Sequence, residues 1–501
     1  MRKAKKALAV GLTVAMSMTM LAGCGDKESS GGSSSKGGSK VDELYLYNSK
    51  GENAEAFEAM GKAYSEETGI KVKTFSIGSG TDHMETLRAE MNSKNKPAVF
   101  TVQTLSELQE WEEGGFALDF NNATVDEFKK LADEIPEGLR LTTDGKNSYG
   151  VPYNVEGYGY ICDTQMISDI FGEANKDAVL AAMKTATYDE WEAGVKTLEE
   201  FATKGTTGKV TYSGQEFEIQ EKTGLAKNLT GVFSVAGSEK WTYGDHMINV
   251  AINAVFPNPA AAKAATDEEV DSLKGAFVKY AQALDLKTSN AAGDKGALKR
   301  GNEMINATTN GYDASVQKLA DGKAIFLKQG NWVYTNVEKV NKEVAQRLTF
   351  LPVKLPVTAD DIKVEGLSPE KMNSSIPVFV PMYYAVNAKA SKAEQEAAQD
   401  FLVWLNTSET GKKFITEDFA FIPYNADPAT TKVNNCLGTS ILEYLQEGNT
   451  LSNPYAGAPS NWSGETVGLE IMEKYLTKEK WDQSDYEAIA DYAIKTWKEM
   501  K

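Results

Sequence analysis

The stretch VDELYLYNSKGENAEAFEAMGKAYSEETGIKVKTF, residues 41–75, decides the predicted fold. Its opening, VDELYLYN, is rich in apolar and β-prone residues and predicts a strand. Phe57, Met60 and Tyr64 then recur at helical spacing, and Gly69 marks the end of that helix. The closing IKVKTF predicts a second strand. Strand, helix and strand in this order form one βαβ unit, which predicts a parallel pair of strands.

The same order continues along the chain. Residues 82–93 and 104–113 predict helices, and the apolar residues 98–102 predict a strand between them. Consecutive βα units indicate a parallel sheet with helices on both faces, and ligands bind such sheets beyond the carboxyl ends of the strands. We therefore expect ligand contacts from the polar residues near these strand ends: Asn48, Lys50, Asp82, His83 and Gln103.

The later part of the chain is mainly helical, apart from two apolar stretches at residues 150–163 and 376–388. Both predict strands that cross between domains. Two crossings make each domain discontinuous and let the halves open and shut as a hinge. We predict an α/β fold of two lobes, with residues 41–156 and 383–435 in lobe 1 and residues 157–382 and 436–501 in lobe 2.

The first residues of the chain have the pattern of a secretory signal. A basic start precedes the uncharged, apolar residues 7–21, and small residues precede Cys24. The alternative, a transmembrane anchor, needs roughly 20 apolar residues, and this run is shorter. We predict a signal peptide over residues 1–23 and a flexible, glycine- and serine-rich linker over residues 24–40.

Residues 21–24, LAGC, resemble the lipobox of bacterial lipoproteins. The resemblance implies that Cys24 becomes the first mature residue and carries a diacylglycerol on its sulfur, with palmitate as a typical acyl chain. Two acyl chains anchor a protein stably, whereas one binds a membrane only marginally. We therefore expect the protein on the outer face of the bacterial cell membrane, held there through the lipid alone.

Composition restricts the partners and the chemistry. The net charge of −18 argues against contact with nucleic acid or anionic lipid and favours a monomeric extracellular protein. Besides Cys24 there are only Cys162 and Cys436, too few for a disulfide framework, although a bridge between them stays open. The two histidines, His83 and His246, are far apart, and metal, nucleotide and serine-hydrolase motifs are missing. We expect no metal and no cofactor.

Several segments, taken in order, resemble the extracellular solute-binding proteins of ABC importers, in the sugar-binding group that includes maltose-binding protein. They are the opening βαβ unit, the first crossing at residues 150–163, the segment LADGKAIFLKQGNWVYTNV at residues 319–337, and FAFIPYN at residues 419–425. The resemblance implies a two-lobed, type II periplasmic-binding-protein-like fold. It also implies a receptor that closes on its ligand and delivers it to a membrane permease without catalysis.

The resemblance further implies particular ligand contacts. Polar residues after the first strand and an acidic residue of the first crossing bind sugar hydroxyls in this family, and they correspond to Asn48, Lys50 and Glu156. Aromatic rings cover the C–H faces of sugars, and charged groups pair with hydroxyls. Tyr383 and Tyr384 alternate on a crossing strand, so that one of them faces the cleft. The candidates from the second half of the chain are Trp241, Tyr312, Asn331, Trp332, Tyr384 and Trp462.

We predict a lipid-anchored receptor that binds an oligosaccharide and passes it to the transmembrane subunits of an ABC transporter. One alternative is a surface glycoside hydrolase, which needs two carboxyl groups roughly 5–9.5 Å apart. Glu156 alone does not make such a pair. Another alternative keeps the fold but binds peptide, phosphate or a metal chelate, which the acidic surface and the few histidines disfavour.

Overall fold

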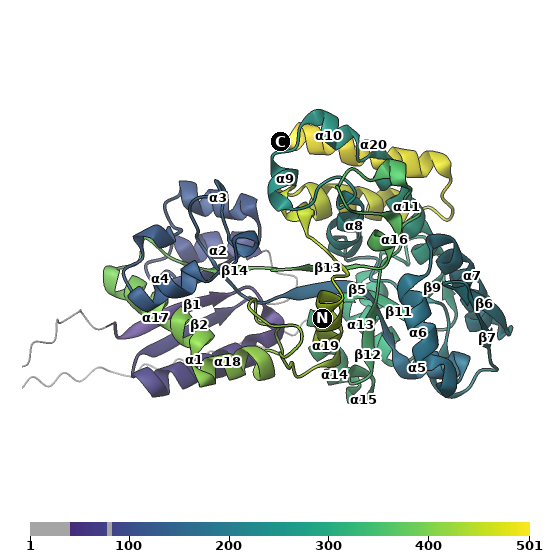
Figure 1. Ribbon diagram of the computed structural model, residues 1–501, viewed down its shortest axis with the longest axis horizontal. Coiled ribbons are helices and arrows are strands. Elements are labelled where there is room, and N and C mark those ends of the chain that lie inside the picture. Colours follow the sequence, from purple (N-terminus) through teal and green to yellow (C-terminus); the bar gives the residue numbers. More distant parts are fainter. Residues whose placement is uncertain (1–40, 78–82) are drawn as a thin grey trace, which may run out of the picture. The chain divides into compact units, whose positions relative to one another are not determined.

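The computed structural model describes residues 41–77 and 83–501 (Figure 1). The predicted signal peptide, Cys24 with its linker, and Asp82 lie outside the described residues. The described strands form a five-stranded sheet, an eight-stranded sheet and a two-stranded hairpin. The hairpin consists of β6 (Gly208–Tyr212) and β7 (Gln215–Ile219).

The five-stranded sheet has the order β2-β1-β3-β14-β4. β1 pairs in parallel with β2 and β3, as the βαβ pattern predicts, whereas β14 pairs antiparallel with β3 and β4. The late strand β14 therefore completes a sheet that the first part of the chain begins. The strands are β1 (Glu43–Asn48), β2 (Lys71–Ser76), β3 (Val99–Val102), β4 (Val151–Pro152) and β14 (Tyr383–Val386).

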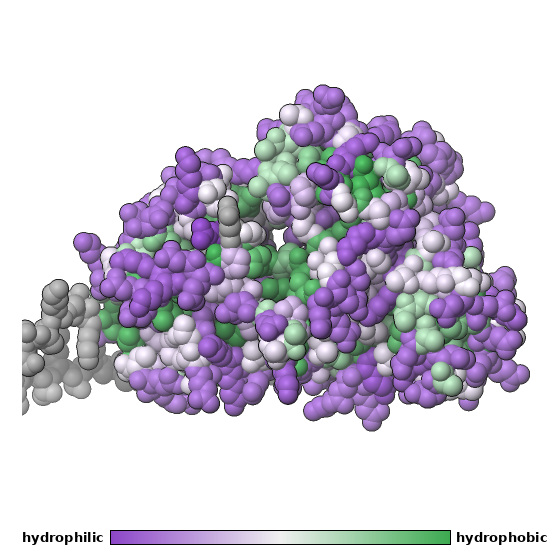
Figure 2. All heavy atoms as spheres, in the orientation of Figure 1, coloured by the Kyte–Doolittle hydropathy of each residue, from purple (hydrophilic) through white to green (hydrophobic). Residues whose placement is uncertain are grey.

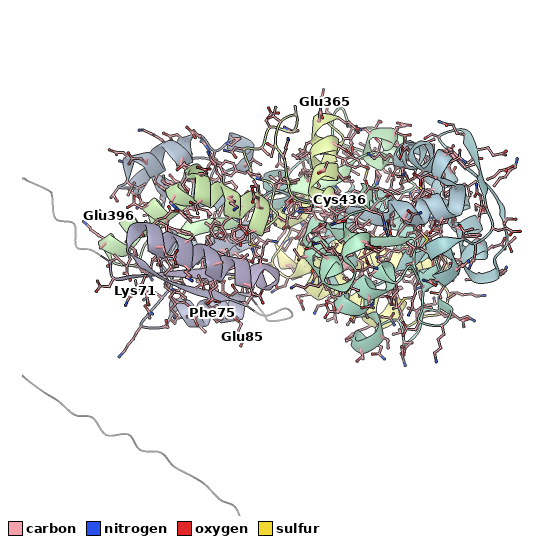
Figure 3. The ribbon with its side chains drawn as sticks, turned by 90° about the horizontal axis from the view of Figure 1, so that it is seen from below. Lys71, Phe75, Glu85, Glu365, Glu396 and Cys436 are labelled. Atoms are coloured by element: carbon pink, nitrogen blue, oxygen red, sulfur yellow. The ribbon has the colours of Figure 1, made fainter. Side chains whose placement is uncertain are left out.

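Helices from both ends of the sequence pack with this sheet. α1 buries Phe57, Met60 and Tyr64, and ends at Gly69, whose φ of 76° requires the left-handed region that glycine adopts readily. Charged side chains such as Glu85 and Glu396 point outward (Figure 3). The helices are α1 (Ala54–Thr68), α2 (His83–Met91), α3 (Leu105–Glu113), α4 (Asp126–Asp133), α17 (Lys392–Thr407) and α18 (Glu409–Lys413).

The eight-stranded sheet is built around β5 (Glu156–Asp163), whose residues are all buried. β5 pairs antiparallel with β11, β12 and β13. β5 is therefore the central strand of this sheet, since three other strands pair with it. The other strands are β8 (Phe233–Ser234), β9 (Ala291–Ala292), β10 (Ala297–Leu298), β11 (Phe326–Gly330), β12 (Leu348–Leu351), β13 (Ile376–Phe379) and β15 (Thr450–Leu451).

The remaining helices lie in the segments that connect these strands and at the C-terminus. They are α5 (Thr164–Phe171), α6 (Lys176–Thr185), α7 (Tyr188–Lys204), α8 (Ile248–Ile252), α9 (Pro259–Lys263), α10 (Asp267–Asp271), α11 (Lys274–Ser289), α12 (Ala307–Asn310), α13 (Tyr312–Ala320), α14 (Tyr334–Val340), α15 (Lys342–Ala345), α16 (Pro369–Asn373), α19 (Cys436–Gln446) and α20 (Gln483–Met500). Within the described part of the chain, no helix has the length and hydropathy of a bilayer span.

The described chain changes sheets three times. It leaves the first sheet after Pro152 and enters the second at Glu156, it returns between Phe379 and Tyr383, and it crosses again between Val386 of β14 and Thr450 of β15. The first two changes fall inside the two apolar stretches identified from the sequence. The limits of the two predicted lobes stay a prediction.

The two described cysteines are free thiols. Cys162 is buried on β5, and the Cys436 thiol donates to the carbonyl of Ala345 over 2.9 Å. The bridge between them that the sequence left open is therefore not formed.

Helix α7 carries an acidic side chain in a poorly solvated place. Glu199 is partly buried, and its Oε2 has no hydrogen-bond partner among the described residues. Burial raises the pKa of Glu199 from an ordinary value near 4.5 to about 7. The folded protein thus holds this proton more tightly than the unfolded chain does.

We expect Glu199→Gln to stabilise the protein by about 1–2 kcal/mol near pH 8, after solvent screening of this partly exposed group is allowed for. The destabilisation by Glu199 is complete above about pH 7 and disappears as the pH falls toward 4.5, because its pKa is raised in the folded state. Urea denaturation near pH 8 and near pH 5 measures the gain. Glu200→Gln, at the exposed next position, is the control, and an equal gain at both pH values would contradict the prediction.

Candidate functional site

A buried polar network fixes the turn after β1. The Asn48 amide nitrogen donates to the carbonyl of Lys50 over 2.8 Å and to Asn53 Oδ1 over 3.0 Å, and its Oδ1 accepts from the Tyr153 hydroxyl. Asn48 is 0% exposed, with both ends of its amide occupied. The Asn48 amide is thus occupied within the turn, and its contact with a ligand stays a prediction. Its role is to hold the turn that presents Lys50.

Lys50 and Glu156 form a buried ion pair between the two sheets. Lys50 Nζ lies 2.5 Å from Glu156 Oε1, and the two side chains are only 7% and 3% exposed. Lys50 follows the first strand of one sheet, and Glu156 begins the central strand of the other. The Asn154 amide donates to the same Glu156 oxygen over 3.1 Å. The pair brings together two of the predicted ligand-binding residues.

The structure also brings together three of the predicted aromatic residues. Trp241 lies 6.2 Å from Tyr312 and 6.4 Å from Trp332, measured between ring centroids, and each ring is partly exposed. Trp332 lies in η7 (Asn331–Val333), directly after β11, and Tyr312 is the first residue of α13. The three rings come from separate segments of the chain, so tertiary packing brings them together.

The sequence did not indicate His246, which lies beside two of these rings, Trp241 and Trp332. Its imidazole is 5.3 Å from Trp241 and 5.1 Å from Trp332, and it stacks on Tyr158 at 4.6 Å. Trp241 is the N-cap of η6 (Thr242–Met247), a π-helix that contains His246, and the i to i+5 spacing brings the two rings onto one side. Burial, with the nearby charge of Lys328, holds the pKa of His246 well below its usual range and keeps the ring neutral. We call Trp241, His246, Tyr312 and Trp332 the ring cluster.

A cavity of about 350 Å³ has one member of this cluster, Trp332, in its lining. It joins the turn after β1 to the turn after β11, and both Asn331 and Trp332 line it. Asn331 is 5% exposed and accepts from the Gly157 N–H over 3.0 Å. The cavity is also lined by Gly51, Asn53, Ala54, Glu55, Ala56, Tyr334, Thr335, Phe419 and Phe421. On the face drawn in Figure 2, hydrophobic residues gather around a central hollow within a mostly hydrophilic surface.

Two further predicted residues lie at the ends of the first sheet. His83 Nε2 is 3.5 Å from Glu107 Oε2, and the Gln103 amide donates weakly to Ser49 Oγ over 3.4 Å. Both side chains are partly exposed. They lie at the strand ends, as the βα pattern predicts, and their contact with a ligand stays a prediction.

The prediction that Trp462 stacks on a ligand is wrong. The side chain is 0% exposed, its ring packs 4.5 Å from Trp497 and 6.0 Å from Phe277, and its N–H donates to the Ala493 carbonyl over 2.8 Å. The segment PSNWSG has a loop-like composition, but Trp462 starts the π-helix η11 (Trp462–Gly468). The ring therefore belongs to the core between α11 and α20.

The structure covers the candidate Tyr384 more fully than Tyr383, and which of the two contacts a ligand stays open. Tyr384 is 3% exposed and packs against Tyr153, with 4.3 Å between the ring centroids. Tyr383, on the opposite face of β14, is the more exposed of the two. Alternation along a strand separates the two faces but does not identify which one is covered.

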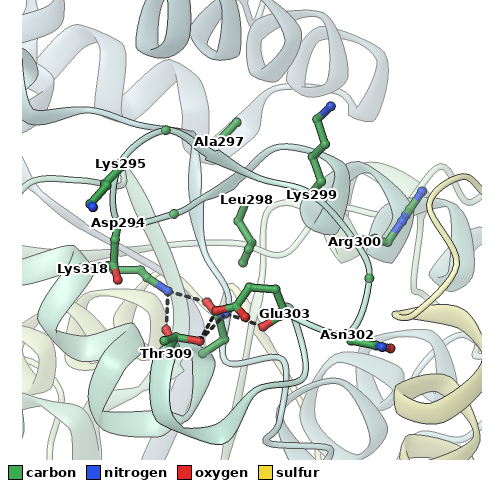
Figure 4. A pocket seen from close by; sticks show the side chains of 14 residues that line it. Asp294, Lys295, Ala297, Leu298, Lys299, Arg300, Asn302, Glu303, Thr309 and Lys318 are labelled. Atoms are coloured by element: carbon green, nitrogen blue, oxygen red, sulfur yellow. Dashed lines mark hydrogen bonds between the residues drawn. The ribbon is translucent and has the colours of Figure 1, made fainter.

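Another cavity, of about 550 Å³, contains none of the predicted site residues. It is lined by residues 293–303 with Thr309, Asn310 and Lys318. In Figure 4 the Lys318 ammonium donates to the Thr309 carbonyl and the Asn310 side chain, and Glu303 accepts from Thr309. These polar groups satisfy one another, so we take the ring cluster and the Lys50–Glu156 pair as the candidate site. Within the described ranges, no group of three or more His, Cys, Asp or Glu side chains is placed to hold a metal ion.

Lys50→Met should lower the free energy of unfolding by about 3–5 kcal/mol, because it leaves the Glu156 carboxylate buried without its cation. Lys50→Met combined with Glu156→Leu should cost much less, since neither charge is then buried. Urea denaturation measures both. The control is Arg88→Met, which breaks a half-exposed pair with Glu110 and should cost about 1 kcal/mol or less. A double variant as unstable as the single one would contradict the role given to the pair.

Comparison with known proteins supports the fold. A family model described as bacterial extracellular solute-binding protein matches residues 59–435. SBP RafE in complex with raffinose has a TM-score of 0.60 at 16% identity, over 92% of this chain and 99% of that one. A chitin oligosaccharide binding protein has a TM-score of 0.59 at 17% identity, over 92% and 99%. The GacH receptor of Streptomyces glaucescens has a TM-score of 0.58 at 10% identity, over 92% and 98%. No curated protein sequence matches the chain.

These likenesses confirm the predicted α/β, two-lobed, type II periplasmic-binding-protein-like fold. The matched family consists of binding proteins, and this excludes the glycoside hydrolase alternative. The model covers most of the 501 residues. The chain therefore belongs to the bacterial extracellular solute-binding proteins.

Proposed function

We propose that the protein is a lipid-anchored receptor that binds an oligosaccharide and delivers it to the transmembrane subunits of an ABC transporter. The observation that carries the proposal is the ring cluster: Trp241, Tyr312 and Trp332 converge, partly exposed, around a neutral His246. Flat rings cover the C–H faces of pyranoses, and a pocket gains most of its affinity from a few such groups.

The buried ion pair supplies the polar half of the proposed site. Lys50 Nζ donates and Glu156 Oε1 accepts, so together they can pair with both the oxygen and the hydrogen of sugar hydroxyls. The ligand would replace the contact between Lys50 and Glu156, and the lobes would close around the ligand. Closure would bend the two short connections between Pro152 and Glu156 and between Phe379 and Tyr383, and the longer one between Val386 and Thr450.

The names of the similar structures support a sugar ligand. They name raffinose for RafE, chitin oligosaccharide for a second protein, and acarbose for GacH. The differences between these ligands leave the identity of the sugar open to experiment. We further propose that the protein acts as a monomer and contacts the membrane only through its lipid.

Trp332→Ala should weaken oligosaccharide binding by about 1–3 kcal/mol, or about tenfold to a hundredfold in Kd, because it removes one stacking face. The measurement is calorimetric titration with the sugars that wild-type protein binds in a panel of raffinose, chitooligosaccharides and maltooligosaccharides. Small-angle scattering should show compaction with the same sugars.

The matched control is Trp404→Ala, on α17 and away from the ring cluster. Trp404 packs on Tyr64, and its N–H donates to Glu67. This variant should lose stability without a change in Kd. A Trp332→Ala protein with wild-type affinity for every bound sugar, or a wild-type protein that binds none of the panel, would count against the proposal.

Cys24→Ser should release the protein from the membrane fraction into the medium, because serine cannot take the thioether-linked diacylglycerol. Fractionation of cells with labelled palmitate measures both the location and the lipid. Cys162→Ser is the control, since this buried thiol on β5 is no lipid acceptor. Full membrane retention of the Cys24→Ser protein would show that the anchor lies elsewhere.

A further inference from the structure

Residues 450–458 run past α8, where two buried amides hold them. Asn249 is 0% exposed, and it donates to the Ser452 carbonyl over 3.0 Å and accepts from the Tyr455 N–H over 3.0 Å. Asn253 is 4% exposed, and it donates to the same carbonyl and accepts from the Ser452 N–H, each over 3.1 Å. Because both amides are buried with their hydrogen bonds made, they fix this segment on α8.

Helix α9 packs directly against η10 (Pro454–Gly457), which lies within the same segment. A Cβ atom on Gly457 would lie 1.8 Å from the Pro259 carbonyl oxygen, so no side chain fits between the two backbones. The helix and the segment therefore form one packed unit. We call this unit, residues 259–263 and 450–458, the strap.

The strap borders the ring cluster. The Tyr455 ring is partly exposed and meets His246 edge-on, with 6.1 Å between the ring centroids. Asn249, which holds the strap, also donates to the hydroxyl of Tyr158 over 2.7 Å, and His246 stacks on that same tyrosine. The strap and His246 thus share one support, and the strap forms a wall beside the ring cluster.

The strap also reaches the helices of the first sheet. η10 contacts α3, and Lys263 Nζ, at the end of α9, donates to Gln109 Oε1 on α3 over 3.1 Å. The Gln109 amide nitrogen in turn donates to Glu113 Oε1 over 2.9 Å. One amide therefore connects a cation of the strap to a carboxylate of α3, and all three side chains are exposed.

This junction is only partly filled. A cavity of about 510 Å³ lies at the contact, and Gln109, Glu113 and Lys263 are all in its lining. Glu112 lines it too, but its two oxygens accept from the Tyr149 and Thr143 hydroxyls of the same half. Exposed charged contacts are weak, so a link of this kind can break and form again without loss of the fold.

We propose that the strap is a latch: the link from Lys263 through Gln109 to Glu113 holds the strap on α3 and keeps the ring cluster enclosed. The inference rests on the proposed function only in taking the ring cluster as the ligand surface. A link that forms in the closed arrangement and breaks in the open one raises the closed fraction without touching the ligand. A bound sugar would then leave only after the latch has opened.

The test measures the distance between the two halves by single-molecule FRET in protein without ligand. The dyes are attached to genetically encoded keto groups that replace two exposed residues, Glu127 on α4 and Glu268 on α10. In the wild type we expect the closed population to fall as NaCl rises from about 0.05 M to about 1 M, because salt screens exposed charges. Lys263→Glu should lower the ratio of closed to open protein about threefold to tenfold.

A charge swap tests the link itself. Glu113→Lys alone should lower the closed fraction as Lys263→Glu does. The double variant, Lys263→Glu with Glu113→Lys, should recover most of it, because the Gln109 amide can turn over and offer its nitrogen to the new carboxylate and its oxygen to the new ammonium. A double variant no more closed than the single ones would overturn the proposal.

Lys196→Glu is the matched control, because it makes the same charge change at an exposed lysine that pairs with Glu192 within α7. It should keep the wild-type distances, and a similar opening there would assign the effect to net charge and refute the latch. Wild-type distances in Lys263→Glu, or a wild-type distribution that is the same at both salt concentrations, would also overturn the proposal.

The consequence for the ligand is measured separately. For any sugar that the wild type binds, Lys263→Glu should raise the dissociation rate about threefold to tenfold, because the closed form opens more often. An unchanged dissociation rate would refute a latch on the ring cluster. A sugar panel without any binder would count against the proposed function and leave the FRET test intact, because that test needs no ligand.

Discussion

The buried ion pair between Lys50 and Glu156 is the interaction on which the arrangement of the site depends. Each residue is fixed by the backbone of a different sheet: Lys50 by the turn after β1, and Glu156 by the first position of β5. Either charge alone, at 7% or 3% exposure, would be strongly unfavourable, so the pair is stable only while both strand ends stay in place. The pair therefore links the two sheets at the point where the chain first crosses from one to the other.

β5 carries this constraint into the second half of the molecule. It pairs with β11, β12 and β13, and β11 leads directly into the turn that holds Asn331 and Trp332. The position of Trp332 thus follows from the same strand that positions Glu156. Trp241 and Tyr312 reach the cluster on separate helical segments, so their spacing depends on packing and not on one local element.

The opening βαβ unit and the ends of its strands could be predicted because period-two and helical spacing are local properties. The predicted strands at residues 41–48 and 98–102 correspond to β1 and β3, and Gly69 does end α1. Trp462, Tyr384 and His246 could not be assigned in this way. π-helices leave no familiar period, and burial of an aromatic ring depends on distant segments such as α11 and α20. Family resemblance indicated Trp332 and Glu156 but contained no information on His246.

The charges near the rings bear on which solutes suit the site. Lys50 balances Glu156, so the charge pair between the two sheets is neutral as a whole. A charged solute would upset this balance and would leave a buried charge without compensation, which is unfavourable by several kcal/mol. A neutral polyol can exchange hydrogen bonds with Lys50 and Glu156 while the total charge stays unchanged. The electrostatics of the buried groups and the convergence of flat rings thus favour the same class of solute for independent physical reasons.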